Sequence, residues 1–289
     1  MKNVIEIKNV NKKFNDFELK DFSISIKKGF VTGFIGGNGD GKSTTIKLIM
    51  NILQPDSGEI KIFGLDYKNY EKEIKQRIGF VYDEGIFYEH LTLHEMKNIV
   101  KRSYKNWDDA LFQSYVQSFQ LPLNKKMKLF SKGMVMKASL AIALSHHAEL
   151  IIMDEPTSGL DPIFRRELLD ILHDLMCDGG KTIFFSTHIT ADLDKIADYI
   201  TFIHNGHHIF TNETYKIQEQ YAVVKGDLSL LDSDIEKEFI ALRKSEHGFE
   251  GLSANKERAY SLFQDIALFE KATLEDIMYY TKKGVDRIV

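Results

Sequence analysis

A glycine-rich stretch, GGNGDGKST at residues 36–44, has the residue types and spacing that bind the phosphates of a nucleotide. It matches the pattern G-x-x-x-x-G-K-[ST], follows an apolar run and precedes a predicted helix. Glycines let backbone N–H groups turn toward phosphates, and the helix N-terminus adds partial positive charge. Lys42 should reach the β- and γ-phosphates, and Ser43 should offer its hydroxyl to Mg²⁺. We expect nucleotide contacts from Gly36, Asn38, Gly39, Gly41, Lys42, Ser43 and Thr44.

Asp40 is the one acidic residue of this stretch, in which Lys42 is the only cation. A carboxylate beside phosphates would repel them. We therefore expect the Asp40 side chain to face solvent or a partner subunit.

Two adjacent carboxylates end a second apolar run, ELIIMDE at residues 149–155. Asp154 could hold Mg²⁺ through water, and Glu155 could polarise an attacking water as a general base. His188 ends a third apolar run, and ligands bind at the carboxyl ends of strands in open α/β sheets. Adjacent acids also occur in solvated loops, and a lone histidine is often structural. Together with the phosphate-binding stretch, however, the pattern favours catalytic roles for Lys42, Glu155 and His188.

The elements that position these residues alternate between strands and helices. The predicted strands cover residues 4–10, 17–26, 30–36, 58–64, 77–82, 149–155 and 181–188, and the predicted helices cover residues 42–53, 164–180 and 189–199. A hairpin is expected around Asn205-Gly206. Residues 89–147 have a mostly helical pattern, which predicts a helical subdomain inserted at about residues 85–147. The pattern weakens near residue 221, so residues 221–289 are expected to form a small accessory domain of α+β type.

Composition limits the location and the partners of the chain. Its 289 residues have a net charge of −4, which argues against a nucleic-acid partner. The single cysteine, Cys177, fits a reducing compartment and is expected to be buried or half-buried. We find no run of 18 apolar residues and no signal-peptide pattern, so we expect a cytoplasmic chain that reaches a membrane only through a partner. The pairs His146-His147 and His207-His208 lack the context of a metal site, and we expect surface or helix-end positions for them.

These motifs, in this order over roughly residues 1–215, resemble the ATP-binding subunit of an ABC transporter. GGNGDGKST is similar to the Walker A motif of that family, IIMDE to Walker B, SGLD (158–161) to the D-loop, and FSKGM (130–134) to the signature. The resemblance implies a P-loop NTPase core of the ABC ATPase type at residues 1–220, with an antiparallel β subdomain and a helical subdomain. It also implies that His188 is the switch histidine and that Phe14 stacks on adenine, although Phe14 could instead be a core residue.

The resemblance further implies a head-to-tail pair of ATPase subunits with ATP between the P-loop of one and the signature of the other. Ser131 and Gly133 would then contact the ATP of the partner, and Asp161 of the D-loop would also contact nucleotide. A serine at a helix start can equally be a plain N-cap, and one residue can do both. The second subunit could be a copy of this chain or a related chain.

Three positions depart from the family pattern. Asp83 stands where the Q-loop glutamine usually contacts water and metal, Lys132 replaces a signature glycine, and Met134 replaces a signature glutamine. Because Lys42, Glu155 and His188 are intact, we expect a working ATPase that uses ATP and Mg²⁺. The alternative is a weakly hydrolytic nucleotide sensor that regulates a membrane or soluble partner.

The resemblance also implies a separate transmembrane permease, docked on residues 85–107. Phe87, Tyr88 and Trp107 could line a groove for it, or could be core residues. Several stretches, including SKGM and LEDIMYYTKKG, are similar to ABC-2 exporters of Gram-positive bacteria, some of which expel amphipathic peptides such as phenol-soluble modulins. A kinase or GTPase is disfavoured, because neither would need the signature. ABC ATPases of DNA repair carry long coiled coils and those that act on the ribosome carry two cassettes in one chain, whereas this sequence has no heptad run and one cassette.

Overall fold

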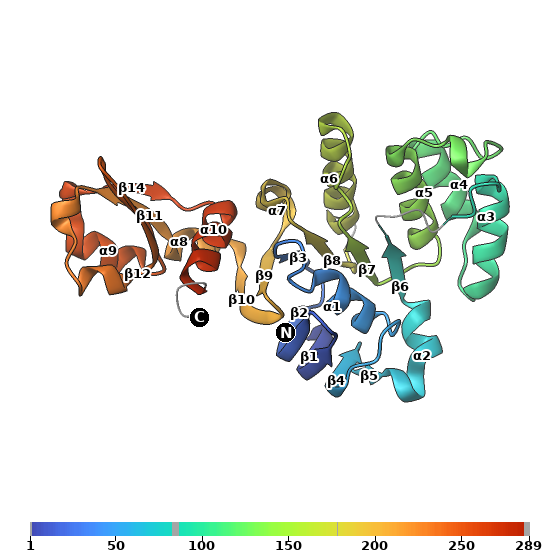
Figure 1. Ribbon diagram of the computed structural model, residues 1–289. Coiled ribbons are helices and arrows are strands. Elements are labelled where there is room, and N and C mark those ends of the chain that lie inside the picture. Colours follow the sequence, from blue (N-terminus) through green and yellow to red (C-terminus); the bar gives the residue numbers. More distant parts are fainter. Residues whose placement is uncertain (1, 83–86, 178, 286–289) are drawn as a thin grey trace. The chain divides into compact units, whose positions relative to one another are not determined.

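The computed structural model describes residues 2–82, 87–177 and 179–285, and the chain divides into two compact units (Figure 1). Unit 1 spans residues 1–211 and unit 2 spans residues 212–289. The second unit therefore begins nine residues before the predicted position 221. The reason is helix α8 (Thr214–Gln220), which packs against α9 (Lys256–Phe263) of unit 2.

A six-stranded sheet with the order β10-β9-β3-β8-β7-β6 forms the centre of unit 1 (Figure 1). Its strands are β3 (Val31–Ile35), β6 (Ile78–Val81), β7 (Leu150–Asp154), β8 (Thr182–Thr187), β9 (Tyr199–His204) and β10 (His207–Glu213). Strands β6, β7, β8, β3 and β9 run parallel, and β3, β7 and β8 are buried along their whole length, as their continuous apolar runs predict. Parallel strands end at one edge of the sheet, so the P-loop, Asp154 and His188 meet there.

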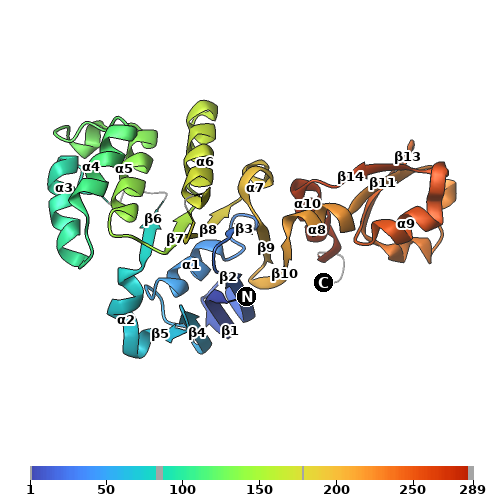
Figure 2. The same ribbon diagram turned by 180° about the vertical axis from the view of Figure 1, so that it is seen from behind.

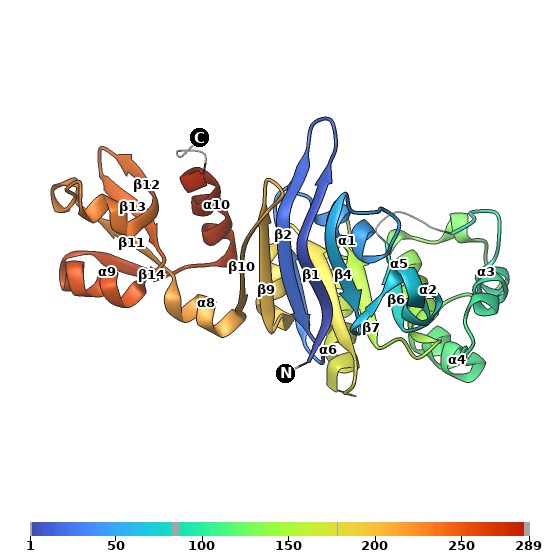
Figure 3. The same cartoon turned by 90° about the horizontal axis from the view of Figure 1, so that it is seen from below.

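A second, antiparallel sheet has the order β2-β1-β4-β5. Figure 3 shows β1, β2 and β4 side by side. The bounds are β1 (Asn3–Lys13), β2 (Glu18–Lys27), β4 (Ser57–Ile62) and β5 (Leu65–Asp66). Helix α1 (Lys42–Ile49) shares a buried core with both sheets. It was predicted to reach residue 53, but it ends at Ile49 because Asn51 adopts a left-handed conformation (φ 56°) and the Ile52 N–H bonds back to the Lys47 carbonyl.

Helices cover the remaining faces of unit 1. They are α2 (Tyr67–Gln76), α3 (Leu93–Val100), α4 (Asp109–Ser118), α5 (Lys132–Leu144), α6 (Pro162–Cys177) and α7 (Thr190–Ile196), with short 3-10 turns η1 (Lys101–Ser103) and η2 (Met127–Leu129). Helices α3 and α4 both pack on α5, and α5 packs on β6. Helix α7 lies so close to β3 that a Cβ on Gly33 would come within 2.3 Å of Leu193. These contacts fix the loops that follow β3, β7 and β8.

Unit 2 is an antiparallel sheet with helices, in the order β12-β13-β11-β14 (Figure 2). Its elements are β11 (Ala222–Gly226), η3 (Leu228–Leu230), η4 (Ile235–Glu238), β12 (Phe239–Ser245), β13 (Gly248–Ser253), α9, η5 (Gln264–Ile266), β14 (Leu268–Lys271) and α10 (Leu274–Val285). Phe239, Phe249 and Phe263 form its aromatic core, with ring centroids 5.7 to 5.9 Å apart. The strand order is that of a split β-α-β unit whose first helix is reduced to 3-10 turns.

The expectation for Cys177 is wrong. Cys177 is exposed, because it ends α6 on the face of the helix that points away from the core. His146 follows the end of α5, as expected for a helix-end residue, but it is not at the surface. Its ring stacks on Tyr104 (3.7 Å between centroids), and Nε2 bonds to the Ile78 carbonyl at 3.0 Å. In the part of the chain that the structure describes, we find no helix with the length and apolar character needed to cross a membrane.

Candidate active site

The glycine-rich stretch connects β3 to α1, as the sequence predicts, and its glycines are required by geometry. Gly39 and Gly41 have φ angles of 84° and 107°, in the left-handed region that other residues rarely adopt. Gly41 precedes α1, and a Cβ there would lie 2.6 Å from the ring of Phe17. The loop can therefore turn its backbone N–H groups toward a ligand at the N-terminus of α1.

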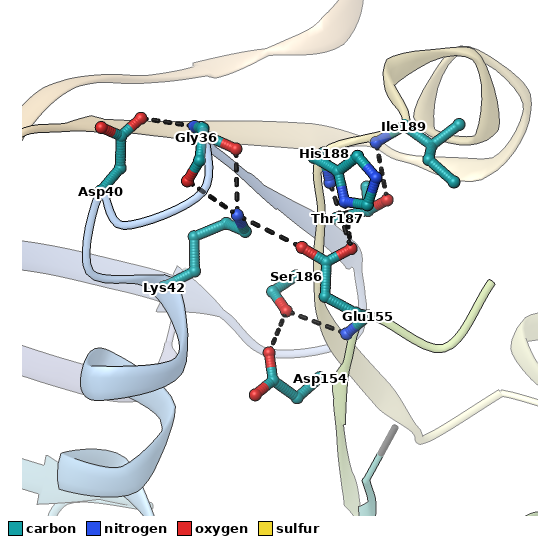
Figure 4. Close-up of polar contacts among 10 residues, drawn as sticks. Gly36, Asp40, Lys42, Asp154, Glu155, Ser186, Thr187, His188 and Ile189 are labelled. Atoms are coloured by element: carbon teal, nitrogen blue, oxygen red, sulfur yellow. Dashed lines mark hydrogen bonds and ion pairs between the residues drawn. The ribbon is translucent and has the colours of Figure 1, made fainter. Parts of the chain in front are cut away.

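Lys42 occupies the centre of the site and is 6% exposed. Its ammonium group donates to the carbonyls of Gly36 (3.0 Å) and Gly37 (3.1 Å) and lies 3.2 Å from Oε1 of Glu155 (Figure 4). A phosphate group that entered the loop would compete with these oxygens for the ammonium group.

A buried serine holds the two acidic residues at the end of β7. The Ser186 hydroxyl donates to Asp154 Oδ1 at 2.5 Å and accepts from the Glu155 N–H at 3.1 Å (Figure 4). The parallel register places Asp154 directly beside Ser186 of β8. Ser186 was not predicted as a site residue, because its role depends on strand register, which the hydrophobic pattern does not reveal.

Glu155 lies between a cation and a histidine. Its Oε2 is 2.8 Å from Nδ1 of His188 and accepts from the His188 N–H at 3.3 Å, while Oε1 faces Lys42. Its backbone is in the left-handed region (φ 49°), which is uncommon for a residue other than glycine and is frequent at functional sites. The Glu155 side chain is 15% exposed and that of His188 is 43% exposed, so solvent reaches the pair.

A pocket of about 580 Å³ opens over the loop, a volume within the range of about 300–1,000 Å³ typical of small-molecule sites. Its lining residues are Phe14, Phe17, Gly37, Asn38, Gly39, Gly41, Lys42, Ser43, Thr44, Glu155, Ser158 and His188. Phe17, Gly37 and Ser158 were not predicted as site residues from the sequence. The rings of Phe14 and Phe17 are 6.4 Å apart, and Phe14 is 39% exposed, so an aromatic surface lies at the pocket beside the phosphate-binding loop.

Gly36 has a different position from the other loop glycines. A Cβ on this residue would lie 2.7 Å from the Ile203 carbonyl, so Gly36 permits close packing of the loop on β9. It takes part in the site through its carbonyl, which accepts from Lys42.

The expectation that Asp40 faces solvent or a partner is wrong. Asp40 is 3% exposed, and its carboxylate accepts hydrogen bonds from the N–H groups of Gly37 and Asn205. The carboxylate also lies 3.1 Å from His204 Nδ1. These donors lie in the loop itself and in the β9–β10 turn, which a local view of the motif does not include.

Ser131, Gly133 and Asp161 do not line this pocket, and each has a local structural role. Ser131 caps α5 by accepting from the Met134 N–H at 3.2 Å, and Asp161 accepts at the start of α6 from the N–H groups of residues 163 and 164. A Cβ on Gly133 would lie 3.0 Å from the ring of Phe164. Asp83 lies outside the described residues.

Comparisons with known proteins agree with this geometry. The family model described as "ABC transporter" matches residues 19–158. The bacitracin transport ATP-binding protein BcrA of Bacillus licheniformis is 35% identical over 211 residues, which cover 71% of this chain and 68% of BcrA. NatA of Bacillus subtilis, an ABC transporter ATP-binding protein, is 32% identical over 207 residues, covering 70% and 84% of the two chains.

Solved structures show the same architecture. The structure of an ATP-binding subunit of an ABC transporter superposes with a TM-score of 0.68 at 28% identity, covering 75% of this chain and 92% of that chain. The dimeric ATP-binding cassette MJ0796 bound to ADP and Pi superposes at 0.64 with 24% identity, which supports the fold alone. The predicted α/β fold of an ABC ATPase is thereby confirmed. This chain belongs to the ATP-binding subunits of ABC transporters, a family of ATPases.

Proposed function

We propose that this chain is the ATP-hydrolysing subunit of an ABC-2 type exporter and works with a separate transmembrane permease at the inner face of the cell membrane. The observation that carries the proposal is the contact chain from Lys42 through Glu155 to His188 beside the phosphate-binding loop. The transport role is supported by two relatives named for bacitracin transport, from Bacillus licheniformis and Enterococcus faecalis.

The contacts suggest an order of events when ATP binds. In the structure, Lys42 is paired with Glu155, and the Gly36 and Gly37 carbonyls share its ammonium group. The γ-phosphate of ATP draws the ammonium group toward itself, because a charged oxygen is a stronger acceptor than a carbonyl. Glu155 Oε1 is then free to accept a proton from an attacking water, while His188 keeps Oε2 in place. The water oxygen bonds to the γ-phosphorus, and the bond between that phosphorus and the β–γ bridging oxygen breaks.

The residues present fit Mg²⁺. Ser43 is an exposed residue of the pocket lining, whereas Asp154 is buried at the end of β7 and does not line the pocket. Hydroxyl and carboxylate oxygens are the ligands that Mg²⁺ prefers. Within the described residues, no cluster of three or more His, Cys, Asp or Glu side chains forms a complete metal cage, which suits an ion held largely by phosphates and water. When bound, the ion neutralises charge on the β- and γ-phosphate oxygens. A contribution from Asp83 stays a prediction.

The catalytic assignment is tested with Glu155→Gln, which removes the charge with little change in shape. Turnover of Mg·ATP should fall about 10²- to 10⁴-fold, the usual contribution of a general base, while ATP binding is retained. Glu219→Gln is the matched control, because Glu219 is exposed on α8 and should leave turnover unchanged. Unchanged turnover in Glu155→Gln would remove Glu155 as the base.

A head-to-tail dimer is the proposed active form, with Ser131 and Gly133 of one subunit at the ATP of the other. Support comes from the helix α5 N-terminus, where Ser131 is exposed and the backbone N–H groups can meet an anion. Glu155→Gln with Mg·ATP should dimerise in analytical ultracentrifugation, and the further change Ser131→Arg should keep it monomeric. A monomer at every concentration of the Glu155→Gln variant would contradict the dimer.

The permease contact is proposed for residues 85–107, of which residues 85 and 86 lie outside the described part of the chain. Tyr88 is 58% exposed and therefore accessible to a partner. Trp107 instead bonds to Asp109 and packs on Phe112, which makes it part of the helical subdomain. Purification from detergent extracts should recover a membrane protein that is lost in Tyr88→Asp. Export of amphipathic peptides such as phenol-soluble modulins stays a prediction, and the identity of that membrane protein would test it.

The second candidate is a weakly hydrolytic nucleotide sensor. The departures Asp83 and Lys132 from the family pattern favour it. The Lys132 ammonium group lies beside Gly159 of the D-loop, 3.0 Å from the position that a Cβ on Gly159 would take. A sensor would bind ATP with normal affinity and show almost no turnover even with the membrane partner present. Turnover that rises with the partner would exclude it.

A further inference from the structure

Asp40 connects the phosphate-binding loop to a distant turn. One carboxylate oxygen accepts from the Gly37 N–H, and the other accepts from the Asn205 N–H at 3.1 Å and from His204 at 3.1 Å. The Asp40 carbonyl accepts from the Gly206 N–H at 3.0 Å. Side chain and backbone of one residue therefore tie the loop to the β9–β10 turn.

His204 contacts Asp40 and Asn205 through its two ring nitrogens. Its Nδ1 faces the Asp40 carboxylate, to which an N–H at Nδ1 can donate. Its Nε2 lies 3.3 Å from the Asn205 side-chain amide nitrogen. Because two backbone N–H groups also donate to it, the buried Asp40 carboxylate is well hydrogen-bonded.

Asp40 and Lys42 hold one peptide group from opposite sides. The Gly36 carbonyl and the Gly37 N–H belong to the same planar peptide, in which they point in opposite directions. The carbonyl accepts from Lys42, and the N–H donates to Asp40. Figure 4 shows the Asp40 carboxylate directed at the start of the loop, while the Lys42 ammonium group points toward Glu155.

The two glycines that this peptide joins have no Cβ, so no side chain of theirs fixes its orientation, although Gly36 packs closely on β9. The hydrogen bonds to Asp40 and Lys42 therefore hold the peptide in this orientation. If the peptide turned over, the Gly36 carbonyl would leave Lys42, and the N–H would face the ammonium group. The buried ammonium group of Lys42 is held by that carbonyl, by the Gly37 carbonyl and by Glu155.

We infer that Asp40 is a positioning residue for ATP binding: it clamps the Gly36–Gly37 peptide opposite Lys42 and is anchored to the β9–β10 turn through His204 and Asn205. The inference rests on the proposed nucleotide site. It explains why an acidic residue is tolerated in a phosphate-binding loop. The carboxylate does not line the pocket, and its charge is stabilised by hydrogen bonds from Gly37, His204 and Asn205.

The test compares Asp40→Ala with Asp40→Asn, using Mg·ATP titration and steady-state turnover. If the competent loop becomes about one tenth as populated, Asp40→Ala raises Kd and KM about tenfold, and kcat stays close to that of the wild type. Asp40→Asn keeps one acceptor oxygen and should give a smaller rise. Asp174→Ala, an exposed acid on α6, is the control and should change none of these quantities.

A change in the anchor should act through Asp40. His204→Leu should raise Kd less than Asp40→Ala, and the double variant should be no weaker than Asp40→Ala alone, because both changes release the same clamp. A loss of folded protein would instead lower apparent kcat at unchanged KM. If Asp40→Ala does not fold, Asp40→Asn and His204→Leu give the same readout.

Two results would overturn the inference. Asp40→Ala could bind ATP as tightly as the wild type or more tightly, as expected if the carboxylate merely repels phosphate. The effects of Asp40→Ala and His204→Leu could also multiply, as expected of independent sites. The proposed function fails on other results: no turnover by the wild-type chain with its membrane partner, or unchanged turnover in Glu155→Gln. In that case the role of Asp40 is still tested by ATP binding alone.

Discussion

Ser186→Ala should destabilise unit 1, because it removes the hydroxyl between the two acidic residues. Ser186 is fully buried and donates to the 4% exposed Asp154 carboxylate. The Glu155 N–H keeps a partner after the change, since it also donates to the Ser186 carbonyl at 3.1 Å. The loss is therefore one hydrogen bond to a buried charged acceptor.

The expected cost follows from that count. A hydrogen bond to a charged group contributes about 1.5–3 kcal/mol to the free energy of unfolding, so we expect a loss of about 2 kcal/mol. With a urea dependence of about 2–3 kcal/mol per molar, the unfolding midpoint should fall by about 0.7–1 M. Turnover of Mg·ATP should fall as well, because Asp154 loses the bond that orients it.

The assay is urea unfolding of the whole chain, followed by a signal from unit 1 such as Trp107 fluorescence. Ser139→Ala is the matched control, since Ser139 is also buried but donates to a neutral helix carbonyl, that of Val135, at 2.9 Å. Its cost should be below about 1 kcal/mol, because alanine favours the helix. Equal midpoints for the two variants would refute the assignment of Ser186 as the support of Asp154.

Other predictions concern packing, pH and accessibility. Gly133→Ala places a Cβ 3.0 Å from the Phe164 ring, which opposes the gain in helix propensity from replacing a helical glycine. Gly133→Ala should therefore raise the urea midpoint more in a Phe164→Leu background than in the wild type, and equal effects in the two backgrounds would contradict the packing role. Burial lowers the pKa of His146 below its ordinary 6.5, so the folded chain binds fewer protons than the unfolded chain and loses stability as pH falls from about 6.5 toward the lowered pKa. His146→Phe should flatten that loss in a pH series of urea midpoints, and an unchanged slope would count against it. Cys177 should react with a maleimide in the folded chain nearly as fast as in urea, and a protected thiol would contradict its exposure.

The sequence predicts the sheet core well because its signal is local. Strands β3, β7 and β8 are continuous apolar runs, and their burial follows from composition alone. The signal for the phosphate-binding loop is also local, since the spacing of its glycines predicts the backbone turn between the strand and the helix. Glu155 and His188 end such strands, which is why the sequence could group them with Lys42.

The rest depends on partners far away in the chain. Ser186 matters because strand register places it beside Asp154, and Asp40 is buried because the turn at Asn205 supplies donors 165 residues later. The end of α1 depends on the left-handed conformation of Asn51, a choice that the periodic pattern alone does not require. For Ser186 and Asp40 the deciding contacts join segments that are far apart in the sequence, whereas the end of α1 is decided by a local backbone conformation.

The two acidic residues around Lys42 differ in how their charge is held, and this difference separates their roles. Asp40 is bound by backbone N–H groups of the loop and of the β9–β10 turn, and by a buried histidine at the end of β9. Glu155 is bound by the side chains of Lys42 and His188, which can turn toward a phosphate. A carboxylate that must accept a proton needs partners that can leave, and a carboxylate that holds a loop needs partners that stay. We therefore expect that mutation of the partners alone cannot exchange the two roles: Asp40 would not become the proton acceptor, and Glu155 would not become the residue that holds the loop.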